Sequence, residues 1–236
     1  SALAEYCGVK YAVVIANGTA ALQTAYFAAG IGQGDEIITS PMTFAATTNA
    51  AIWQGAKLVF VDVESKTGNI DANLIEEKIT TKTRAIVAVD YSGLPCDYDA
   101  LEKIAKKHNL LLIDDAAHSL GAEYHDKKIG GLADLTTLSF HPVKSITTGE
   151  GGAVLTDNEV FYKKLLLFRS HGITKDKNDF VNEPHGPWYH EMQELGLNYR
   201  MTDLQAALGT SQLAKLSSFM DARRKIAAHY SKELAG

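Results

Sequence analysis

The feature that most constrains the fold is a repeated alternation of short apolar runs with amphipathic stretches. The runs have the length of strands, and some of them, such as Tyr11–Ala16 and Leu110–Ile113, are apolar throughout. A strand whose residues are all apolar is covered on both faces, whereas a strand with one solvated face alternates apolar and polar residues. The sequence therefore predicts an α/β fold with a mostly parallel sheet and helices on both of its faces.

The predicted elements alternate along most of the chain. Strands are expected at residues 11–16, 36–39, 57–61, 84–89, 110–113, 135–140 and 153–155. Helices are expected at residues 19–29, 43–53, 71–79 and 97–108. The last two strands are joined by a loop that is too short for a helical crossover, so we expect them to pair antiparallel. That pairing would be a departure from a pure dinucleotide-binding fold.

The last part of the chain has a different character. Residues 171–196 mix glycines and prolines with charged residues, which predicts a long irregular loop with a functional role. Thr202 opens a predicted long helix, because Gln205 three residues later completes a capping box. Apolar side chains are expected along one side of this helix at Leu204, Leu208, Leu216, Phe219, Ile226 and Tyr230.

Composition excludes several classes of protein. Apolar residues make up 46% of the 236 residues and charged residues 22%, which suits a buried core and is too apolar for disorder. The net charge of −5 lacks the basic surplus of a nucleic-acid-binding protein, and no apolar run approaches the roughly 18 residues of a membrane span. Because Cys7 and Cys96 lack ligand spacing, we expect no disulfide framework, no metal centre and a cytoplasmic location.

Candidate binding residues follow the predicted strands, since ligands of open α/β sheets bind at the carboxyl ends of strands. The first strand leads into Asn17-Gly18-Thr19 at a helix N-terminus, where free backbone N–H groups suit a phosphate. Neither a Walker-type loop nor the full glycine pattern of a dinucleotide site is present. An ordinary strand–helix turn is the alternative interpretation of this segment.

Two further strands lead into residues that can carry chemistry. The strand at 110–113 is followed by Asp114-Asp115-Ala116-Ala117-His118, and carboxylates at a buried strand end are costly without a cationic partner. The strand at 135–140 is followed by Lys144, in a loop rich in glycine and threonine. A buried lysine amine readily loses its proton and attacks carbonyl carbons. Taken singly, these features also fit a helix cap with a solvated acid and a surface lysine.

Considered together, the three segments fit one ligand. It would carry a phosphate for Gly18 and Thr19, an aldehyde for Lys144 and a ring nitrogen for Asp115. Pyridoxal 5′-phosphate (PLP) carries all three groups. The alternative is a nucleotide-binding or interaction module that uses Gly18 and Thr19 for another phosphate, but it leaves Lys144 and Asp115 without a joint purpose.

Five separated motifs support this interpretation. They are Asn17-Gly18-Thr19-Ala20-Ala21-Leu22, Pro41-Met42-Thr43-Phe44, Asp115-Ala116-Ala117-His118, Ser139-Phe140-His141-Pro142-Val143-Lys144 and Leu197-Asn198-Tyr199-Arg200-Met201. With these motifs in this order, the chain resembles the DegT/DnrJ/EryC1/StrS sugar aminotransferases, within the fold-type I PLP enzymes. The resemblance extends from Ala2 to about Tyr230 and implies an α/β large domain like that of aspartate aminotransferase.

The resemblance implies catalytic roles for two residues. Lys144 would bind PLP covalently and move the substrate proton, and Asp115 would pair with the pyridine nitrogen. Phe44 would stack on the ring, although an ordinary core aromatic is the alternative for this residue. His118 would lie beside the ring or near its oxygen.

The resemblance also implies how the cofactor phosphate is held. Gly18, Thr19 and Ser139 would bind the phosphate within the chain. Asn198 would reach the phosphate of the neighbouring subunit's PLP, so the active sites would be shared in a homodimer. A turn residue before the helix at Thr202 is the alternative for Asn198.

Lysine at position 144 favours transamination, because dehydratase relatives in this group carry histidine there. L-glutamate would supply the amino group, and a nucleotide-linked keto sugar would accept it. Residues 140–152 and Pro187-Trp188-Tyr189 are most similar to one branch, which aminates a UDP-linked 4-keto-6-deoxy N-acetyl hexose on the route to pseudaminic acid. Other UDP- or dTDP-linked 4-keto sugars are alternative substrates, and a non-catalytic regulator with the PLP fold is the alternative to an enzyme.

Family chains extend beyond both ends of the region that this chain covers. The resemblance implies that residues 1–200 form the PLP-binding large domain. Residues 201–236 would form a long helix leading towards a small C-terminal domain that the chain lacks. We therefore expect this chain to keep the cofactor pocket and to show weak or no turnover by itself.

Overall fold

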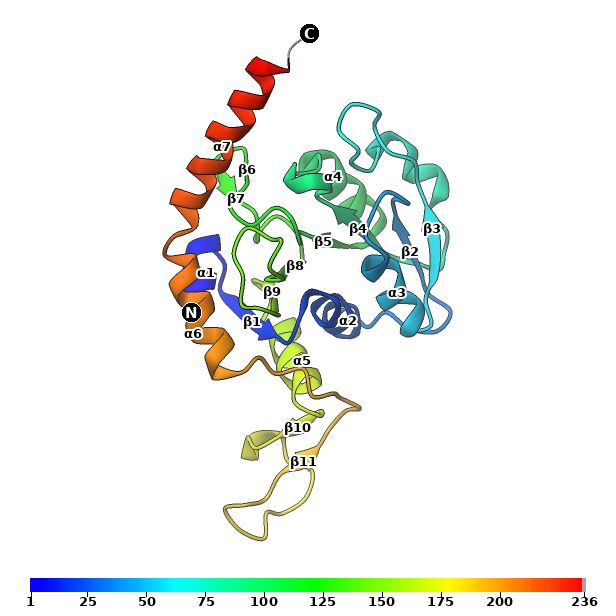
Figure 1. Cartoon of the computed structure of the whole chain (residues 1–236). Helices are drawn as coiled ribbons and strands as arrows, with labels where there is room; N and C mark the ends of the chain where they lie inside the picture. The colour runs from blue at the N-terminus through cyan, green and yellow to red at the C-terminus, as the bar shows by residue number, and fades with distance from the viewer. Residues whose placement is uncertain (235–236) are drawn as a thin grey trace.

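The computed structural model describes residues 1–234. Its centre is a seven-stranded sheet with the order β1-β9-β8-β5-β4-β2-β3 (Figure 1). The strands are β1 (Tyr11–Ile15), β2 (Glu36–Thr39), β3 (Lys57–Phe60), β4 (Thr83–Val89), β5 (Leu111–Asp115), β8 (Leu135–Ser139) and β9 (Gly152–Thr156). Strands β8, β5, β4, β2 and β3 are parallel. Strand β9 is antiparallel to both β1 and β8, which confirms the pairing predicted for the last two strands.

Helices cover both faces of the sheet, as the apolar strands predict. One face carries α2 (Gly18–Ala28), α3 (Ala45–Trp53) and α5 (Glu159–Arg169), and their apolar side chains share one core with those of the sheet. The other face carries α1 (Ala2–Cys7) and α4 (Tyr98–His108), which belong to a second core. Alternate residues of β4 enter the two cores, because successive side chains of a strand point to opposite faces. The predicted fold class is confirmed.

Polar side chains at the strand ends start the helices that follow. The Asn17 side chain accepts the N–H of Ala20 at 2.8 Å and begins α2, and Asp97 accepts the N–H of Ala100 at 3.1 Å and begins α4. Such caps satisfy backbone donors that the helix itself leaves without partners. The chain therefore turns sharply from β1 into α2, which places the N-terminus of α2 at the carboxyl edge of the sheet.

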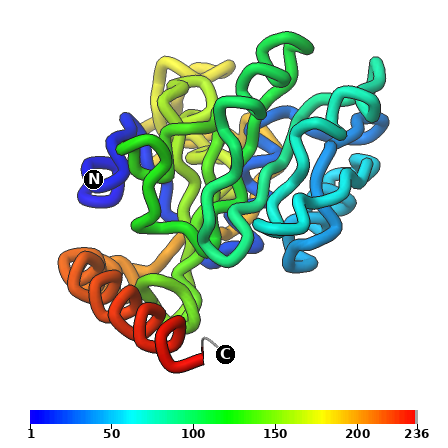
Figure 2. Tube along the Cα trace, turned by 90° about the horizontal axis from the view of Figure 1, so that it is seen from above, coloured from blue at the N-terminus to red at the C-terminus, as the bar shows by residue number. Residues whose placement is uncertain are grey.

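The predicted C-terminal helix is two helices, α6 (Asp203–Leu213) and α7 (Leu216–Glu233). The capping box of Thr202 and Gln205 is present. Leu216 is fully buried, whereas Leu204, Leu208, Ile226 and Tyr230 are exposed, so most of the expected apolar stripe does not contact the rest of the chain. Figure 1 and Figure 2 both show α7 leading away from the body of the molecule. No helix within residues 1–234 combines the length and the apolar character that crossing a bilayer requires.

The structure corrects the sequence analysis at several elements. The helix expected at 71–79 is replaced by two short 3-10 turns, η1 (Ala72–Leu74) and η2 (Glu76–Lys78), since Ile75 between them is the buried residue and the neighbouring turns bury none. Helices α1 and α5 were not predicted. Residues 171–196, called the arm below, contain a short hairpin of β10 (Ile173–Thr174) and β11 (Glu191–Met192) instead of wholly irregular chain. The structure also has a small hairpin of β6 (Glu123–Tyr124) and β7 (Lys127–Lys128).

Candidate active site

A cavity of about 680 Å³ lies at the carboxyl ends of β1, β4, β5 and β8. We call it the strand-end cavity. Among the residues named from the sequence, those that line it are Gly18, Thr19, Phe44, Asp115, His118, Ser139 and Lys144. The structure therefore brings together residues that are as far apart in the sequence as Gly18 and Lys144, as expected for ligand sites of open α/β sheets.

One wall of the cavity is the turn from β1 into α2. The first N–H groups of an α-helix have no partner within the helix, and the helix dipole makes this end favourable for anions. Gly18 approaches Ser139 so closely that a Cβ at position 18 would lie 2.8 Å from the Ser139 Cβ. Glycine at position 18 thus lets the helix N-terminus lie directly beside Ser139 at the cavity wall, where both can contact a small anion.

Asp115 ends β5 and is 6% exposed. Its Oδ2 accepts a hydrogen bond of 2.5 Å from the Thr47 hydroxyl, and its Oδ1 accepts one of 3.3 Å from the N–H of Ala117. Burial raises the pKa of Asp115 above its ordinary value, whereas the Thr47 hydrogen bond, the Ala117 N–H, His118 and Lys144 lower it. The carboxyl group is therefore held in place by donors that favour its ionised form.

Asp114, its neighbour in the strand, points away from this chemistry. It is fully buried, it does not line the cavity, and neither of its carboxyl oxygens has a hydrogen-bond partner among residues 1–234. Burial, followed by the charge of Asp90, raises the pKa of Asp114 well above its ordinary value. The two adjacent acids predicted at this strand end therefore differ in role, and Asp115 is the one that faces the cavity.

Lys144 is half-buried and lines the cavity from the loop between β8 and β9. Burial lowers its pKa below the ordinary value, and the negative charge of Asp115 opposes this shift. Burial also lowers the pKa of His118, and so does the positive charge of Lys144. A lowered pKa increases the fraction of uncharged amine at neutral pH, which is the form that attacks a carbonyl carbon.

The lysine loop is held from two sides. Within the loop, the N–H of Lys144 donates to the carbonyl of His141 at 2.9 Å, and the N–H of Thr148 donates to the carbonyl of Phe140 at 2.9 Å. From α6, the side-chain amide of Gln205 donates to the carbonyl of Glu150 at 2.8 Å. From α7, the Arg223 guanidinium donates to the carbonyls of Lys144 and Ser145. These contacts restrict the positions open to the Lys144 amine.

Phe44 and Asn198 differ in their relation to the cavity. Phe44 lines the cavity with its side chain 76% exposed, so it is a wall residue and not the ordinary core aromatic of the alternative interpretation. Asn198 is exposed and lies outside the cavity lining of its own chain, where its backbone bridges that of Ser170. The role expected for Asn198 requires a second copy of the chain and stays a prediction.

Two contributors to the site were missed in the sequence analysis. Tyr199 lines the cavity, and its hydroxyl hydrogen-bonds the side chain of Gln23. Thr47 is buried behind the wall and contacts Asp115. Thr47 lies one helical turn after Thr43 of the Pro41-Met42-Thr43-Phe44 motif, and this spacing is the signal that could have identified it.

The chain is similar to known proteins over its whole length. A family model described as the DegT/DnrJ/EryC1/StrS aminotransferase family matches residues 1–236. A UDP-4-amino-4,6-dideoxy-N-acetyl-beta-L-altrosamine transaminase from Campylobacter jejuni is 46% identical over 235 residues, which are 98% of this chain and 60% of that protein. The chain thus spans about three fifths of the length of this relative.

Two solved structures also match this chain. The Helicobacter pylori aminotransferase PseC, involved in the biosynthesis of pseudoaminic acid, matches with a TM-score of 0.90 and 40% identity over 98% of this chain and 60% of that one. The PLP form of a putative sugar aminotransferase from Streptococcus pneumoniae matches with a TM-score of 0.89 and 31% identity over 99% of this chain and 62% of that one. These matches cover the whole sheet and the strand-end cavity.

Proposed function

The chain belongs to the DegT/DnrJ/EryC1/StrS aminotransferase family, and from that premise we propose that it binds PLP in the strand-end cavity. We further propose that the protein transfers an amino group from L-glutamate to a UDP-linked 4-keto-6-deoxy N-acetyl hexose. One observation carries the proposal. A half-buried lysine amine, a buried carboxyl group and a helix N-terminus line a single cavity, at Lys144, Asp115 and Gly18.

These residues fit the three reactive parts of PLP. The helix N-terminus at Gly18 and the adjacent Ser139 side chain, which both line the cavity, suit the phosphate, and Thr19 stands in the same helix turn. The Lys144 amine suits the aldehyde, and the Asp115 carboxylate suits the ring nitrogen. Donors for an anion, a nucleophile for a carbonyl and an acceptor for a protonated nitrogen thus occur in one place.

Each side chain would have a distinct task in the reaction. When bound, PLP supplies an electron sink for the substrate carbon that loses its proton. Lys144 would hold the cofactor and carry that proton on its Nζ, which its lowered pKa favours. Asp115 would keep the ring nitrogen protonated. Phe44 would cover one face of the ring, and His118 would lie at its edge.

A homodimer with shared active sites forms part of the proposal. Asn198 is exposed and lies outside the cavity of its own chain, which supports a contact with the PLP phosphate of a second subunit. Residues 1–200 would form the PLP-binding domain, and 201–236 would lead towards a small C-terminal domain. Cys7 and Cys96 are free and buried, which supports a reducing cytoplasm as the location.

Substrate identity is supported by the relatives. The Campylobacter jejuni protein is named for the amino sugar of the proposed reaction, and residues 140–152 resemble the same branch. Amination of another UDP- or dTDP-linked 4-keto sugar is the alternative reaction. A non-catalytic regulator that binds PLP is the alternative to an enzyme, but the presence of both Lys144 and Asp115 in the cavity favours an enzyme.

The proposal is tested with purified full-length protein. Borohydride reduction after incubation with PLP should add the cofactor mass to the peptide that contains Lys144, and L-glutamate should shift the visible absorption band. A panel of UDP- and dTDP-linked 4-keto sugars would then identify the acceptor. Protein that stays colourless and gains no mass would rule out the proposed function, and a band that L-glutamate does not shift would favour the regulator.

A further inference from the structure

A pair of threonine hydroxyls lies directly behind Asp115, at the start of α3. The hydroxyl oxygens of Thr43 and Thr47 are 2.7 Å apart, and the Thr47 hydroxyl is 2.5 Å from Asp115 Oδ2. Thr43 lines the strand-end cavity, while Thr47 is fully buried. The two side chains therefore connect the cavity wall to the carboxyl group through hydroxyl groups alone.

The direction of these hydrogen bonds is fixed by the carboxylate. An ionised carboxyl group can only accept, so the Thr47 hydroxyl must donate its proton to Asp115. Having given its one proton, the Thr47 hydroxyl accepts from Thr43. The donors thus point from the cavity wall towards Asp115, and a hydrogen bond to a charged acceptor is stronger than one between neutral groups.

The backbone of Thr47 is held independently of Asp115. The hydroxyl of Tyr26, which is fully buried in α2, donates to the Thr47 carbonyl at 2.9 Å. The Thr47 N–H donates to the carbonyl of Phe44 at 3.2 Å in the first turn of α3. Because a β-branched side chain is restricted at χ1, a fixed backbone leaves the hydroxyl few directions, and the contacts with Thr43 and Asp115 select one of them. The donor is therefore in place before any ligand arrives.

We propose that Thr47, oriented by Thr43, is a positioning residue that holds the Asp115 carboxylate ionised and in a fixed plane for the ring nitrogen of PLP. The inference rests on the proposed function. It assigns a part in cofactor binding to a residue that lies outside the cavity lining. With Thr47 on Oδ2 and the Ala117 N–H on Oδ1, each carboxyl oxygen has one donor, so rotation of the group would break both bonds.

The charged surroundings of Asp115 agree with this role. Burial raises the pKa of Asp115, and the Thr47 hydrogen bond opposes that shift more than the Ala117 N–H, His118 or Lys144 does. Two other titratable neighbours are held in their neutral forms beside it. Burial, the charge of Asp90 and that of Asp115 raise the pKa of Asp114, and burial and the charge of Asp115 raise the pKa of Tyr26 in α2. Removal of the Thr47 hydroxyl therefore raises the pKa of Asp115 further and shifts its ionisation to higher pH.

The test compares Thr47→Val, which removes the hydroxyl at nearly equal volume, with Thr47→Ser, which keeps it. The readouts are the dissociation constant of PLP for the apoprotein from pH 5 to 8 and the pH dependence of the visible band. We expect Thr47→Val to weaken PLP binding about tenfold or more near neutral pH and to move the acid limb of binding to higher pH. Thr47→Ser should stay near the wild type in both measurements.

Thr39→Val is the matched control. Thr39 is also fully buried, and its hydroxyl donates to the carbonyl of Val87 at 2.9 Å without touching Asp115. We expect this variant to lose thermal stability while its PLP affinity and pH profile stay unchanged. An equal loss of PLP affinity in Thr39→Val and Thr47→Val would overturn the inference, and so would wild-type binding by Thr47→Val.

A second variant covers the case in which Thr47→Val does not fold. Thr43 is half-exposed, so Thr43→Val should fold, and it should weaken PLP binding about threefold because Thr43 acts through Thr47. Wild-type binding by Thr43→Val would remove Thr43 from the inference. Failure of the wild-type protein to take up PLP would instead refute the proposed function, so the two failures are distinguishable.

Discussion

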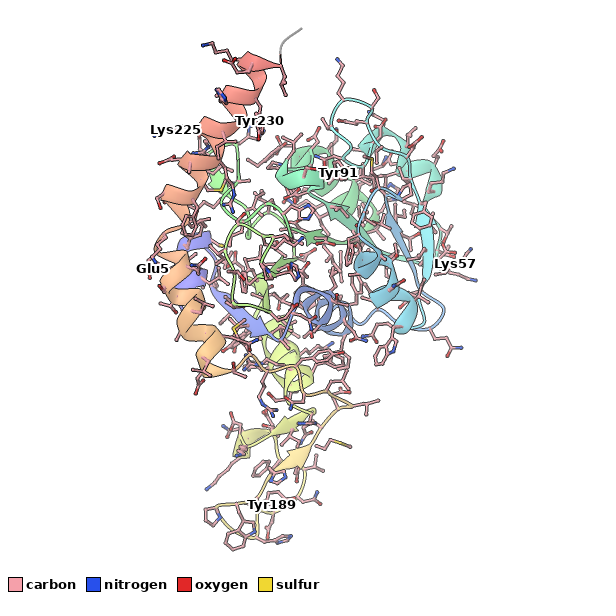
Figure 3. The ribbon with its side chains drawn as sticks, in the orientation of Figure 1. Glu5, Lys57, Tyr91, Tyr189, Lys225 and Tyr230 are labelled. Carbon is pink, nitrogen blue, oxygen red and sulfur yellow. The ribbon has the colours of Figure 1, made fainter. Side chains whose placement is uncertain are left out.

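The strand-end cavity and the arm at 171–196 differ in how their chain is held. Around the cavity, contacts come from several elements, including α2, α3, the lysine loop, α6 and α7. In the arm several hydrogen bonds converge on one carboxylate, since Glu191 accepts from the N–H groups of Val181 and Asn182 at 2.7 and 2.8 Å. It also accepts from the Tyr189 hydroxyl at 2.7 Å. Figure 3 shows Tyr189 at the outer end of the arm, far from the sheet.

The two regions also differ in what they expose. The cavity is backed by buried residues such as Asp115 and Thr47, whereas Trp188, Met192 and Leu195 of the arm are exposed. Many buried contacts within one chain can fix the positions of the cavity residues without help from a partner. A solvent-exposed segment with few buried contacts is instead easily ordered or displaced by a partner. Substitutions in one region should therefore leave the other unchanged, and four experiments test this separation.

The largest effect is expected from Lys144→Ala. In the full-length protein, removal of the amine would take away both the proposed attachment point for PLP and the group proposed to move the substrate proton, so amine transfer should fall at least about a thousandfold. Transfer assays and the visible band measure the change, and hydrogen exchange of the arm should stay as in the wild type. Lys163→Ala is the control, since Lys163 is exposed on α5 and pairs with Glu159. Substantial transfer by Lys144→Ala would contradict the assigned role.

Gly18→Ala should have the next largest effect. The added Cβ would lie 2.8 Å from the Ser139 Cβ, so the turn or the strand end must move, at a cost of about 1–3 kcal/mol in unfolding free energy. The same shift should weaken PLP binding, because it displaces the helix N-terminus or Ser139, which are proposed to hold the phosphate. Calorimetry and PLP titration measure the two effects.

Gly32→Ala provides a matched control for this glycine. A Cβ there would meet one atom, the Gln54 carbonyl oxygen, at 3.9 Å, which is an ordinary contact. Its unfolding temperature and PLP affinity should stay close to those of the wild type. Equal behaviour of the two variants would show that the close approach of Gly18 to Ser139 does not shape the site.

Much of the fold was predictable because apolar runs of strand length occur in a regular order. The helix expected at 71–79 was wrong because its periodicity includes one buried residue, Ile75, which two short turns can bury equally well. The single helix expected from Thr202 is interrupted before Leu216, whose burial in the core shared with α1 and α4 redirects the chain into α7. Local pattern thus indicates which segments are buried, but the packing partner decides where an element ends.

The residues of the candidate site also differ in how far the sequence could predict them. Lys144, Asp115 and Gly18 were predictable because they directly follow strands, and the topology of a parallel sheet brings strand ends together. Thr47 was harder to identify, since its partner Asp115 is 68 residues away and its spacing from Thr43 is the one local signal. Asn198 could be predicted only through the family resemblance, because its expected ligand belongs to another subunit.

Glu191→Gln should affect the arm and leave the cavity unchanged. The hydrogen bonds from Val181, Tyr189 and Asn182 lower the pKa of Glu191 to about 2. The contribution of Glu191 to arm stability is therefore complete above the ordinary glutamate pKa and is lost as the pH falls towards 2. In the variant, hydrogen exchange at residues 177–193 should already be fast at neutral pH, while PLP affinity stays constant. Slow exchange in the variant would show that other contacts hold the arm.

The smallest effect is expected from Arg223→Ala, which tests whether α7 influences the cavity. The guanidinium donates to the carbonyls of Ser145 at 3.2 Å and Lys144 at 3.3 Å, but it is exposed, so water competes for both bonds. We expect a two- to threefold fall in kcat with KM nearly unchanged, about the effect of one exposed hydrogen bond on a residue that moves a proton. Arg224→Ala is the control, because Arg224 pairs with Asp221 on the same helix and makes no bond to the lysine loop. Equal rates for the two variants would mean that the lysine loop is positioned without α7, and a loss comparable to that of Lys144→Ala would mean that α7 belongs to the site itself.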